Sequence, residues 1–433
     1  MSQEAPAVRP ATLDGWLQYI ERLHPQGIAL GLERVAMVKD ALGLVTDFVL
    51  ITVGGTNGKG SACAMLESIL SHAGYKVGCY TSPHLLRYNE RVRIARREAD
   101  DAALTDAFSA VEAARGNTQL TYFEFGTLAA AWLFVDARID VAILEVGLGG
   151  RLDAVNVFDA DCALVTSVAF DHMNYLGTTR EEIGYEKAGI FRAGRAAICA
   201  DPEPPQSLRR HAAEIGAPLL VRGVDFDFEA ERTQWRYRGP HGSRHGLPYP
   251  VLRGTHQLAN ASACLTALDA LRERVPVTMD DIRAGLLEAE MPGRFQVLPG
   301  RPAVILDVAH NPAAAAMLAD NLAQMGRAGR TFAVFAMLRD KDIAGVIAAV
   351  QARIDHWFVA GIDAARGAKA GTILEILRAA HVSAFTECPS IIDAYAQACD
   401  MATETDRILV FGSFYTVTAV MQARAARQTP PRV

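Results

Sequence analysis

The most constraining feature of the sequence is the stretch from Phe48 to Ser61, FVLITVGGTNGKGS. Its first half, through Val53, is a short apolar run rich in β-branched residues, which is typical of a buried strand. A glycine-rich turn follows, and an apolar segment from Ala62 to His72 then ends before Gly74, as a helix does. This order predicts a phosphate-binding loop, because the loop N–H groups and the helix dipole both favour an anion there.

The loop departs from the standard pattern G-x-x-x-x-G-K-[ST]. Val53 stands where that pattern has its first glycine, and Gly60 separates Lys59 from Ser61. A glycine-rich turn without a ligand is the alternative, but a lysine and a serine at the helix start favour bound phosphate. The candidate phosphate-binding residues are Gly55, Thr56, Asn57, Gly58, Lys59, Gly60 and Ser61.

Length and composition restrict the class of protein. A chain of 433 residues is long enough for two or three domains, and its net charge of −6 gives no reason to expect nucleic acid as a partner. The 7 cysteines are scattered through apolar segments, which indicates reduced thiols rather than a disulfide framework. The N-terminus, MSQEAPAVRPATLDGW, lacks an apolar signal core, and no apolar run has the length of a membrane span. We therefore expect a cytoplasmic protein that binds no membrane.

Strand-like and helical segments alternate along most of the chain, which predicts an α/β fold. Strands are expected at 75–80, 140–146 and 162–168, helices at 12–23 and 101–115, and a hairpin excursion at 222–250. The Pro- and Gly-rich segment 291–302 is the expected domain boundary. Strand-like runs then resume at 303–308, 331–337, 356–361 and 407–412. The prediction is a larger parallel-sheet domain over residues 1–296 and a smaller Rossmann-like α/β domain over 297–433.

Polar side chains follow several expected strands of the first domain. Ser82, Glu145 and His172 each lie at or beyond the carboxyl end of such a strand, where ligands collect in open parallel sheets. Each has a simple alternative: a turn serine, a buried ion-paired glutamate, a histidine that caps a helix. Beside a phosphate-binding loop, oxygen ligands and an imidazole favour a Mg²⁺ or Mn²⁺ site. The basic segment 87–97 is read equally well as a solvated strand edge or as an anion-binding segment.

Seven short motifs occur in a specific order along the chain: GTNGKGS, SPHL, TYFEFGT, EVGLGGRLDA, DH…LG…EKAGIF, PGRF and DVAHNP. Together they resemble the dihydrofolate synthases and folylpolyglutamate synthases of the Mur ligase superfamily, from about Leu30 to Tyr415. The resemblance implies a P-loop-containing domain like the central domain of Mur ligases and a C-terminal domain that closes over the nucleotide. It also implies a ligase that joins L-glutamate to dihydropteroate and to reduced folates, using ATP and an acyl-phosphate intermediate.

The resemblance assigns roles to residues of this chain. Lys59, Lys187 and His172 are the expected catalytic residues, and two Mg²⁺ sites are expected, one at Ser82 and Glu145 and one at Glu145 and His172. Asn260, Arg294 and Asp307, with His310 close by, are expected to contact the nucleotide. The expected substrate-binding residues are Leu30, Gly31, Leu32, Thr121, Tyr122, Phe123, Glu124, Leu152, Asp153 and Ala154.

Lys187 in the EKAGIF motif has two readings. In one it forms a surface ion pair with Glu182 or Glu186, worth about 0.3–0.5 kcal/mol. In the other, which the resemblance implies, its amine carries a carbamate that orients the second metal ion. A monovalent cation is a further candidate cofactor, and we expect a monomer.

Three other functions compete with this one. In these alternatives the chain is a folylpolyglutamate synthase only, a Mur-type ligase of cell-wall synthesis, or a P-loop kinase or nucleotide switch. The TYFEFGT segment and the lack of an extra N-terminal domain for a sugar nucleotide disfavour the cell-wall ligase. A kinase or switch would have no need of the DVAHNP domain or the Lys187 segment.

Overall fold

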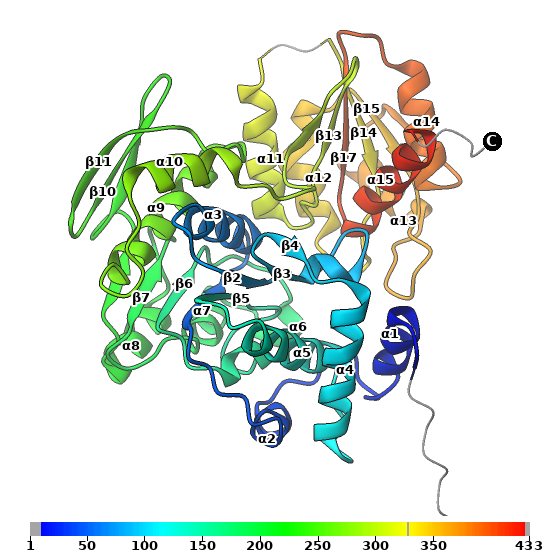
Figure 1. Cartoon of the computed structure of the whole chain (residues 1–433). Coiled ribbons are helices and arrows are strands. Elements are labelled where there is room, and N and C mark those ends of the chain that lie inside the picture. The colour runs from blue at the N-terminus through cyan, green and yellow to red at the C-terminus, as the bar shows by residue number, and fades with distance from the viewer. Residues whose placement is uncertain (1–9, 327–328, 429–433) are drawn as a thin grey trace, which may run out of the picture. The chain divides into compact units, whose positions relative to one another are not determined.

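The computed structural model describes residues 10–326 and 329–428 (Figure 1). Residues 1–9, 327–328 and 429–433, which belong to the expected domains, lie outside this description. The chain divides into two compact units. Unit 1 comprises residues up to 168, 179–249 and 259–289, and unit 2 comprises 169–178, 250–258 and the chain from 290 onward.

Unit 1 is built on an eight-stranded sheet in the order β4-β3-β2-β5-β1-β6-β7-β8. The strands from β2 to β8 in this order are parallel, and β3 and β4 add an antiparallel edge. All six residues of β1 are buried, as a central strand covered on both faces requires. The strands are β1 (Val49–Gly54), β2 (Val77–Tyr80), β3 (Val92–Ile94), β4 (Arg97–Glu98), β5 (Val141–Glu145), β6 (Cys162–Val165), β7 (Ala196–Cys199) and β8 (Leu219–Val221).

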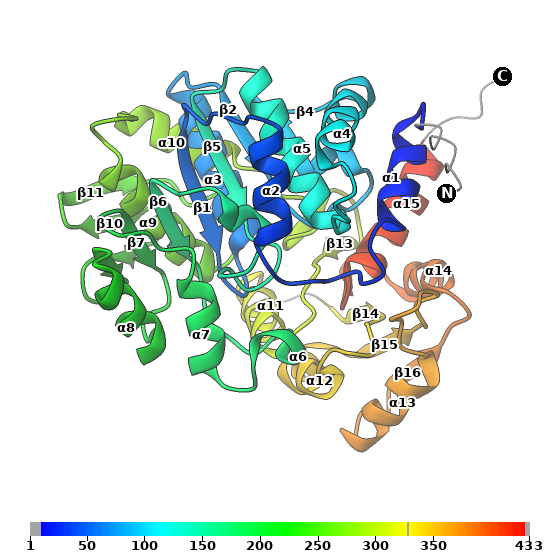
Figure 2. The ribbon, with the colours of Figure 1, turned by 90° about the horizontal axis from the view of Figure 1, so that it is seen from below.

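Helices cover both faces of this sheet. Helix α3 (Lys59–His72) packs on β1, β2 and β5 and against α10 (Met279–Glu288), where a Cβ on Gly285 would lie 2.5 Å from the Ile69 Cα. Helix α5 (Tyr122–Asp136) packs on β2 from the other face, with α2 (Glu33–Ala41) against it (Figure 2). The remaining helical elements of this unit are α1 (Leu13–Glu21), η1 (Tyr88–Arg91), α4 (Asp101–Arg115), η2 (Ala154–Val157), α7 (Arg180–Ala188), α8 (Gln206–Ile215) and most of α9 (Thr255–Ala270).

The excursion predicted at 222–250 is a separate antiparallel sheet of three strands, β9 (Asp227–Ala230), β10 (Trp235–Gly239) and β11 (Gly242–Leu247). Trp235 and Tyr237 are fully buried, and the Tyr237 hydroxyl hydrogen-bonds Thr266 Oγ1 at 2.9 Å. These two aromatic side chains anchor the small sheet to α9.

Unit 2 contains a six-stranded sheet in the order β12-β13-β17-β14-β15-β16, in which only the edge strand β12 is antiparallel. Its core includes Phe335, Trp357 and Phe411, with ring centroids 4.7–6.0 Å apart. The strands are β12 (Gln296–Leu298), β13 (Ala303–Leu306), β14 (Thr331–Phe335), β15 (His356–Val359), β16 (Phe385–Glu387) and β17 (Arg407–Phe411). The helical elements are α6 (Met173–Leu176), α11 (Pro312–Gln324), α12 (Ile343–Val350), η3 (Gln351–Arg353), α13 (Ala370–Ala379), α14 (Ile391–Met401) and α15 (Phe414–Gln428).

The predicted α/β class, with a mostly parallel sheet followed by a second, smaller α/β sheet, is confirmed. Helix α4 has the predicted bounds, and Thr12 caps α1 by accepting a hydrogen bond from the Gly15 N–H at 3.2 Å. The prediction for 162–168 was too long, because β6 ends at Val165 and the next residues turn toward the glycine-rich loop. No helix in the described part of the chain is long and apolar enough to cross a bilayer.

Candidate active site

The glycine-rich loop connects β1 to α3, as predicted. Gly55 and Gly58 have φ values of 137° and 92°, in the region that side chains disfavour. A Cβ on Gly55 would collide with Thr166 Oγ1, and one on Gly58 would lie 2.8 Å from Asn260 Oδ1. These two positions therefore require glycine both for conformation and for space.

Neighbouring segments of unit 1 fix the loop. The Thr56 N–H donates to the Ser167 carbonyl at 2.8 Å, and the Thr166 hydroxyl donates to the Asn57 carbonyl at 2.7 Å. Lys59, the first residue of α3, donates from Nζ to the carbonyls of Gly55 (3.1 Å) and Thr56 (3.2 Å). The loop thus places an ammonium group, several N–H groups and the N-terminus of a 14-residue helix together. Asn260, predicted to contact the nucleotide, lies beside this loop.

Ser82 and Glu145 lie together at the carboxyl ends of β2 and β5. The Glu145 side chain is only 3% exposed, and its Oε2 accepts a hydrogen bond from the Ser82 N–H at 3.0 Å. Serine and glutamate both carry side-chain oxygens, the ligand type that a hard divalent cation prefers. Among the described residues, no group of three or more His, Cys, Asp or Glu side chains is arranged to hold a metal ion. His172, the third predicted metal ligand, belongs to unit 2.

The three predicted substrate-binding segments meet within unit 1. The Gly31 N–H donates to the Leu152 carbonyl at 3.4 Å, which joins the first and third segments. Arg34 Nη2 donates to Glu124 Oε1 and to the Ala29 carbonyl, both at 2.9 Å, and this links residues on either side of the first segment to the second. The sequence had placed these segments in one site from resemblance alone, and in the structure they are neighbours.

The side chains in these segments have different tasks. Thr121 and Glu124 form the capping box of α5, with the Thr121 N–H donating to Glu124 Oε2 at 2.8 Å, so both support the helix start. The Phe123 ring packs 5.8 Å from the Tyr80 ring and leaves room only for glycine at Gly147, where a Cβ would lie 2.7 Å from Phe123 Cζ. Tyr122 and Phe123 are both partly exposed.

Asp153 is a buried carboxyl group among these segments. It accepts hydrogen bonds from the Leu148 N–H at 2.8 Å and the Val155 N–H at 3.0 Å. Burial raises its pKa to about 7, although these hydrogen bonds and the charge of Lys59 act in the opposite direction. Near neutral pH this group therefore exists in both protonation states.

Lys187 lies in the last turn of α7 and is only 2% exposed. The alternative prediction placed Lys187 at the surface, and this location is wrong because the residue is buried. Glu186 instead pairs with Arg151 at 2.7 Å, and the Glu186 carbonyl accepts a hydrogen bond from the Arg151 N–H at 2.7 Å. These contacts hold the end of α7 against the EVGLGGRLDA segment.

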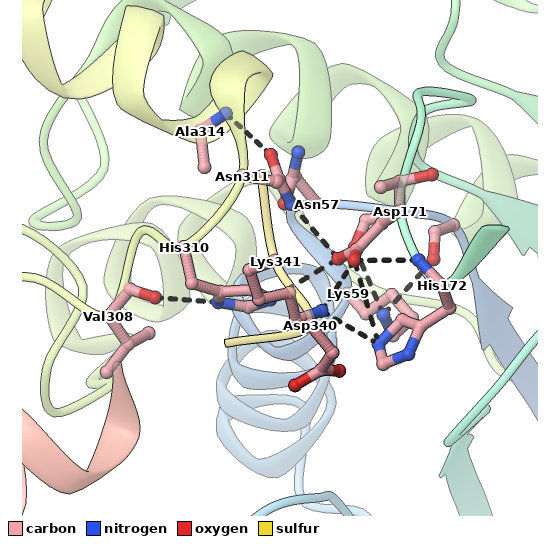
Figure 3. Close-up of polar contacts among 12 residues, drawn as sticks. Asn57, Lys59, Asp171, His172, Val308, His310, Asn311, Ala314, Asp340 and Lys341 are labelled. Carbon is pink, nitrogen blue, oxygen red and sulfur yellow. Dashed lines mark hydrogen bonds and ion pairs between the residues drawn. The ribbon is translucent and has the colours of Figure 1, made fainter. Parts of the chain in front are cut away.

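Unit 2 contains a polar cluster centred on Asp171, shown in Figure 3. Lys341 Nζ donates to Asp171 Oδ1 at 2.5 Å, Asn311 Nδ2 donates to Oδ2 at 3.2 Å, and His310 Nε2 lies 3.3 Å from Oδ2. Lys341 Nζ is also 3.3 Å from His172 Nε2. The side chains of Lys341 and Asp171 are only 7% and 9% exposed.

Two opposing effects act on Asp171. Burial favours the neutral acid, but the hydrogen bond from His310 and the charges of His310, His172 and Lys341 outweigh it, and the pKa lies far below its usual range. Asp171 is therefore a carboxylate at neutral pH. It orients His310 and Lys341, two side chains that could bind an anion.

The other predicted residues of unit 2 lie around the DVAHNP motif. Asp307 accepts hydrogen bonds from the Phe295 N–H at 2.8 Å and the Ala309 N–H at 2.7 Å, and burial raises its pKa. The guanidinium of Arg294 lies 5.1 Å from the centroid of the Phe414 ring, and the His310 ring lies 6.3 Å from it. Arg294 and His310 thus share one aromatic neighbour.

Asp171, Asn311 and Lys341 were not among the predicted site residues. Two features of the sequence could have identified two of these residues. Asp171 is part of the DH pair of the fifth motif, and Lys341 follows strand β14 in the second sheet, just as Glu145 lies at the end of strand β5 in the first. The rule that ligands collect at the carboxyl ends of parallel strands applies to the second sheet as well.

Replacing Asp171 with asparagine is expected to destabilise the fold of unit 2 by about 3 kcal/mol at pH 7, because Lys341 would stay buried without its carboxylate. The pKa of Asp171 is lower in the folded protein than in the unfolded chain, where it is near 4. The carboxylate therefore stabilises the native state at pH values above about 4, and this contribution is lost as the pH falls. Denaturant unfolding from pH 3 to 8 should show a difference between the two proteins that shrinks on the acid side. A constant difference would contradict the assignment.

Comparison with known proteins identifies the family of this chain. The Mur ligase middle domain model matches residues 53–268, and the model of the Mur ligase glutamate ligase domain matches residues 293–414. The chain is 46% identical over 418 residues to the dihydrofolate synthase/folylpolyglutamate synthase of Escherichia coli strain K12, covering 96% of each chain.

Solved structures agree with these matches. Escherichia coli FolC in complex with DHPP and ADP superimposes with a TM-score of 0.92 at 46% identity, covering 97% of this chain and 99% of that one. A bifunctional folylpolyglutamate synthase/dihydrofolate synthase with Mn, AMPPNP and L-glutamate bound gives a TM-score of 0.89 at 46% identity, covering 98% and 100%. The chain therefore belongs to the dihydrofolate synthase/folylpolyglutamate synthase family of ATP-dependent Mur ligases.

Proposed function

We propose that this protein joins L-glutamate to dihydropteroate and also adds L-glutamate to reduced folates. The observation that carries the proposal is that the three substrate segments meet in the same unit as the phosphate-binding loop. A carboxylate is a poor electrophile, so one of its oxygens must first take the γ-phosphoryl group of ATP and release ADP. The glutamate amine then attacks the acyl carbon, and the tetrahedral intermediate expels phosphate.

In this proposal the glycine-rich loop binds the nucleotide phosphates. Lys59 and the loop N–H groups balance the charge of the transferring phosphoryl group, while Gly58 and Asn260 form the neighbouring wall. Arg294, Asp307 and His310 would contribute nucleotide contacts from unit 2. Lys341, held by Asp171, offers positive charge for the carboxylates of the incoming glutamate, and His310 lies beside the same carboxylate of Asp171.

Ser82, Glu145 and His172 would hold Mg²⁺ in two sites. When bound, the metal neutralises phosphate charge and orients the reacting groups. We further propose that Lys187 carries a carbamate, formed when its neutral amine bonds to CO₂ and loses a proton. A monovalent cation is a further candidate cofactor. The burial of Lys187 supports this modification, since an unmodified ammonium is costly to bury.

The substrate segments could bind a flat heterocycle between aromatic side chains and recognise it through a carboxyl group. Tyr122 and Phe123 offer aromatic faces next to Asp153, whose protonation near pH 7 lets it exchange hydrogen bonds with pterin nitrogens. We also expect the protein to be cytoplasmic, because all 7 cysteines are free, as in a reducing compartment. We expect a monomer as well, and light scattering after size-exclusion chromatography would reveal a dimer.

A phosphate-release assay separates this function from a nucleotide switch. Release should require L-glutamate together with dihydropteroate or tetrahydrofolate, and should stay near background when either partner is omitted. Phosphate release that is independent of both would overturn the proposal. Activity with tetrahydrofolate but none with dihydropteroate would restrict the protein to folylpolyglutamate synthesis.

A further inference from the structure

Arg91 ends η1 and begins the turn into β3, within the basic segment 87–97. Its guanidinium lies 5.4 Å from the ring centroids of both Tyr88 and Tyr122, and these two rings meet edge to face at 5.9 Å. Its Nε donates to His84 Nδ1 at 2.9 Å. Two rings and one imidazole thus fix the position of this cation.

All of these partners are neutral. Burial, together with the charge of Arg91, lowers the pKa of His84 to about 4, so the imidazole accepts the hydrogen bond without carrying charge. Glu90, the neighbour in sequence, directs its carboxylate to three backbone N–H groups at 2.7–2.8 Å. No carboxylate in the described ranges 10–326 and 329–428 forms an ion pair with Arg91.

Other partly buried arginines of unit 1 differ in this respect. Arg34 pairs with Glu124 at 2.9 Å, and Arg93 pairs with Glu67 at 2.7 Å. Arg91 instead keeps both Nη groups without a hydrogen-bond partner among the described residues. Because a guanidinium is planar, these two groups offer parallel donors to a ligand that has two neighbouring acceptors.

Arg91 belongs to the same aromatic cluster as the segment proposed to bind the pterin. A Cβ on Gly126 of α5 would collide with the Tyr88 hydroxyl and would lie 3.1 Å from the Tyr80 hydroxyl, so both tyrosines reach the same turn of that helix. The Tyr80 ring in turn packs 5.8 Å from the Phe123 ring. The contacts of Arg91 therefore lead directly to the proposed pterin-binding side chains.

The buried Tyr80 hydroxyl also links Arg91 to Asp153. Burial raises the pKa of Tyr80 to about 12, and the charges of Arg91 and Asp153 act on this hydroxyl in opposite directions, Arg91 lowering the pKa and Asp153 raising it. Both groups thus lie within electrostatic range of one hydroxyl. A cation with two available donors and a carboxyl group are the polar groups that this aromatic cluster offers to a ligand.

A pterin matches this pair of groups. Its 2-amino group and N3–H are donors, which suit a carboxylate, whereas O4 and N5 are neighbouring acceptors on the adjacent edge. Arginine binds O6 and N7 of guanine through two parallel hydrogen bonds, and O4 and N5 of a dihydropterin have the same arrangement. We propose that Arg91 donates its two Nη groups to O4 and N5 and is a further substrate-binding residue for the pteroyl group.

This inference rests on the proposed function and makes a distinction between its two acceptors. Dihydropteroate has an unprotonated imine nitrogen at N5, so it offers Arg91 both acceptors. In tetrahydrofolate N5 carries a hydrogen, and the contact with O4 is the main one that remains. Loss of Arg91 should therefore weaken the binding of both acceptors, and that of dihydropteroate more strongly.

The test compares the wild-type enzyme with Arg91→Gln at saturating ATP and L-glutamate. Arg91→Gln should raise the KM for dihydropteroate at least tenfold and that for tetrahydrofolate by a smaller factor, and leave the KM for ATP within twofold. The matched control is Arg87→Gln in the same segment, whose side chain is 67% exposed and pairs with Glu98 at the surface, and it should change none of these constants. An unchanged KM for dihydropteroate in Arg91→Gln would overturn the inference.

A second measurement distinguishes a direct contact from a role in positioning Tyr122. A dihydropteroate analogue with C–H in place of N5 should have at least a fivefold higher KM than dihydropteroate in the wild type. In Arg91→Gln the two acceptors should have about the same KM, because the interaction is already lost. Equal KM values in the wild type, or additive effects of the two changes, would contradict a contact with N5. A wild-type enzyme inactive with both natural acceptors would instead refute the proposed function.

Discussion

Replacing Lys59 with methionine is expected to lower turnover about a thousandfold while leaving the fold intact. One charge on a transferring phosphoryl group commonly supplies several kcal/mol of transition-state stabilisation. Lys59 Nζ donates to the carbonyls of Gly55 and Thr56, two bonds to loop oxygens whose loss should cost little stability. Methionine keeps the length of the side chain and removes only its charge and donors.

Single-turnover and steady-state assays would measure this effect, with thermal unfolding as the check on the fold. Lys76→Met is a suitable control, because Lys76 is an exposed lysine of the same unit that follows α3. It should retain wild-type turnover. A Lys59→Met enzyme with turnover within tenfold of wild type would remove Lys59 from the transferring phosphoryl group.

Replacing Lys187 is expected to have a similarly large effect, for a different reason. If the residue carries a carbamate, Lys187→Ala removes an anion from the site and should nearly abolish turnover. Added formate or acetate should then restore part of the activity by filling the space with a carboxylate. Lys59→Met offers the comparison, since it should gain nothing from either acid.

A direct observation should accompany the rescue. Protein prepared with ¹³C-labelled bicarbonate should show a carbamate carbon signal that disappears in Lys187→Met, a variant that preserves packing at this 2%-exposed position. Wild-type turnover in Lys187→Ala would return the residue to a purely structural role. Absence of the carbon signal in an active wild-type enzyme would rule out the modification.

Much of unit 1 could be predicted because its signals are local. The run from Val49 to Gly54, the glycines after it and the capping residue Thr12 each act over a few residues, and the structure contains the expected strand, loop and helix. The short strands β12 and β16, of three residues each, were not predicted, because three residues carry no distinct hydrophobic period.

The cluster around Asp171 was missed for a different reason. Asp171 and Lys341 are 170 residues apart in sequence, and no local pattern pairs them. Their contact exists because the segment 169–178 belongs to unit 2, although this segment follows strand β6 of unit 1 in the sequence. Likewise, a sequence shows that Arg91 is basic, but not that its partners are two tyrosines and a neutral histidine.

The central claim is the ligation of glutamate to two kinds of acceptor, and the mass of the products tests it most directly. Purified enzyme with ATP, Mg²⁺ and L-glutamate should convert dihydropteroate to a product heavier by one glutamyl residue, and should likewise lengthen tetrahydrofolate. Lys59→Met, treated in parallel, should yield neither product. Unchanged acceptor masses after complete ATP consumption by the wild-type enzyme would contradict the account.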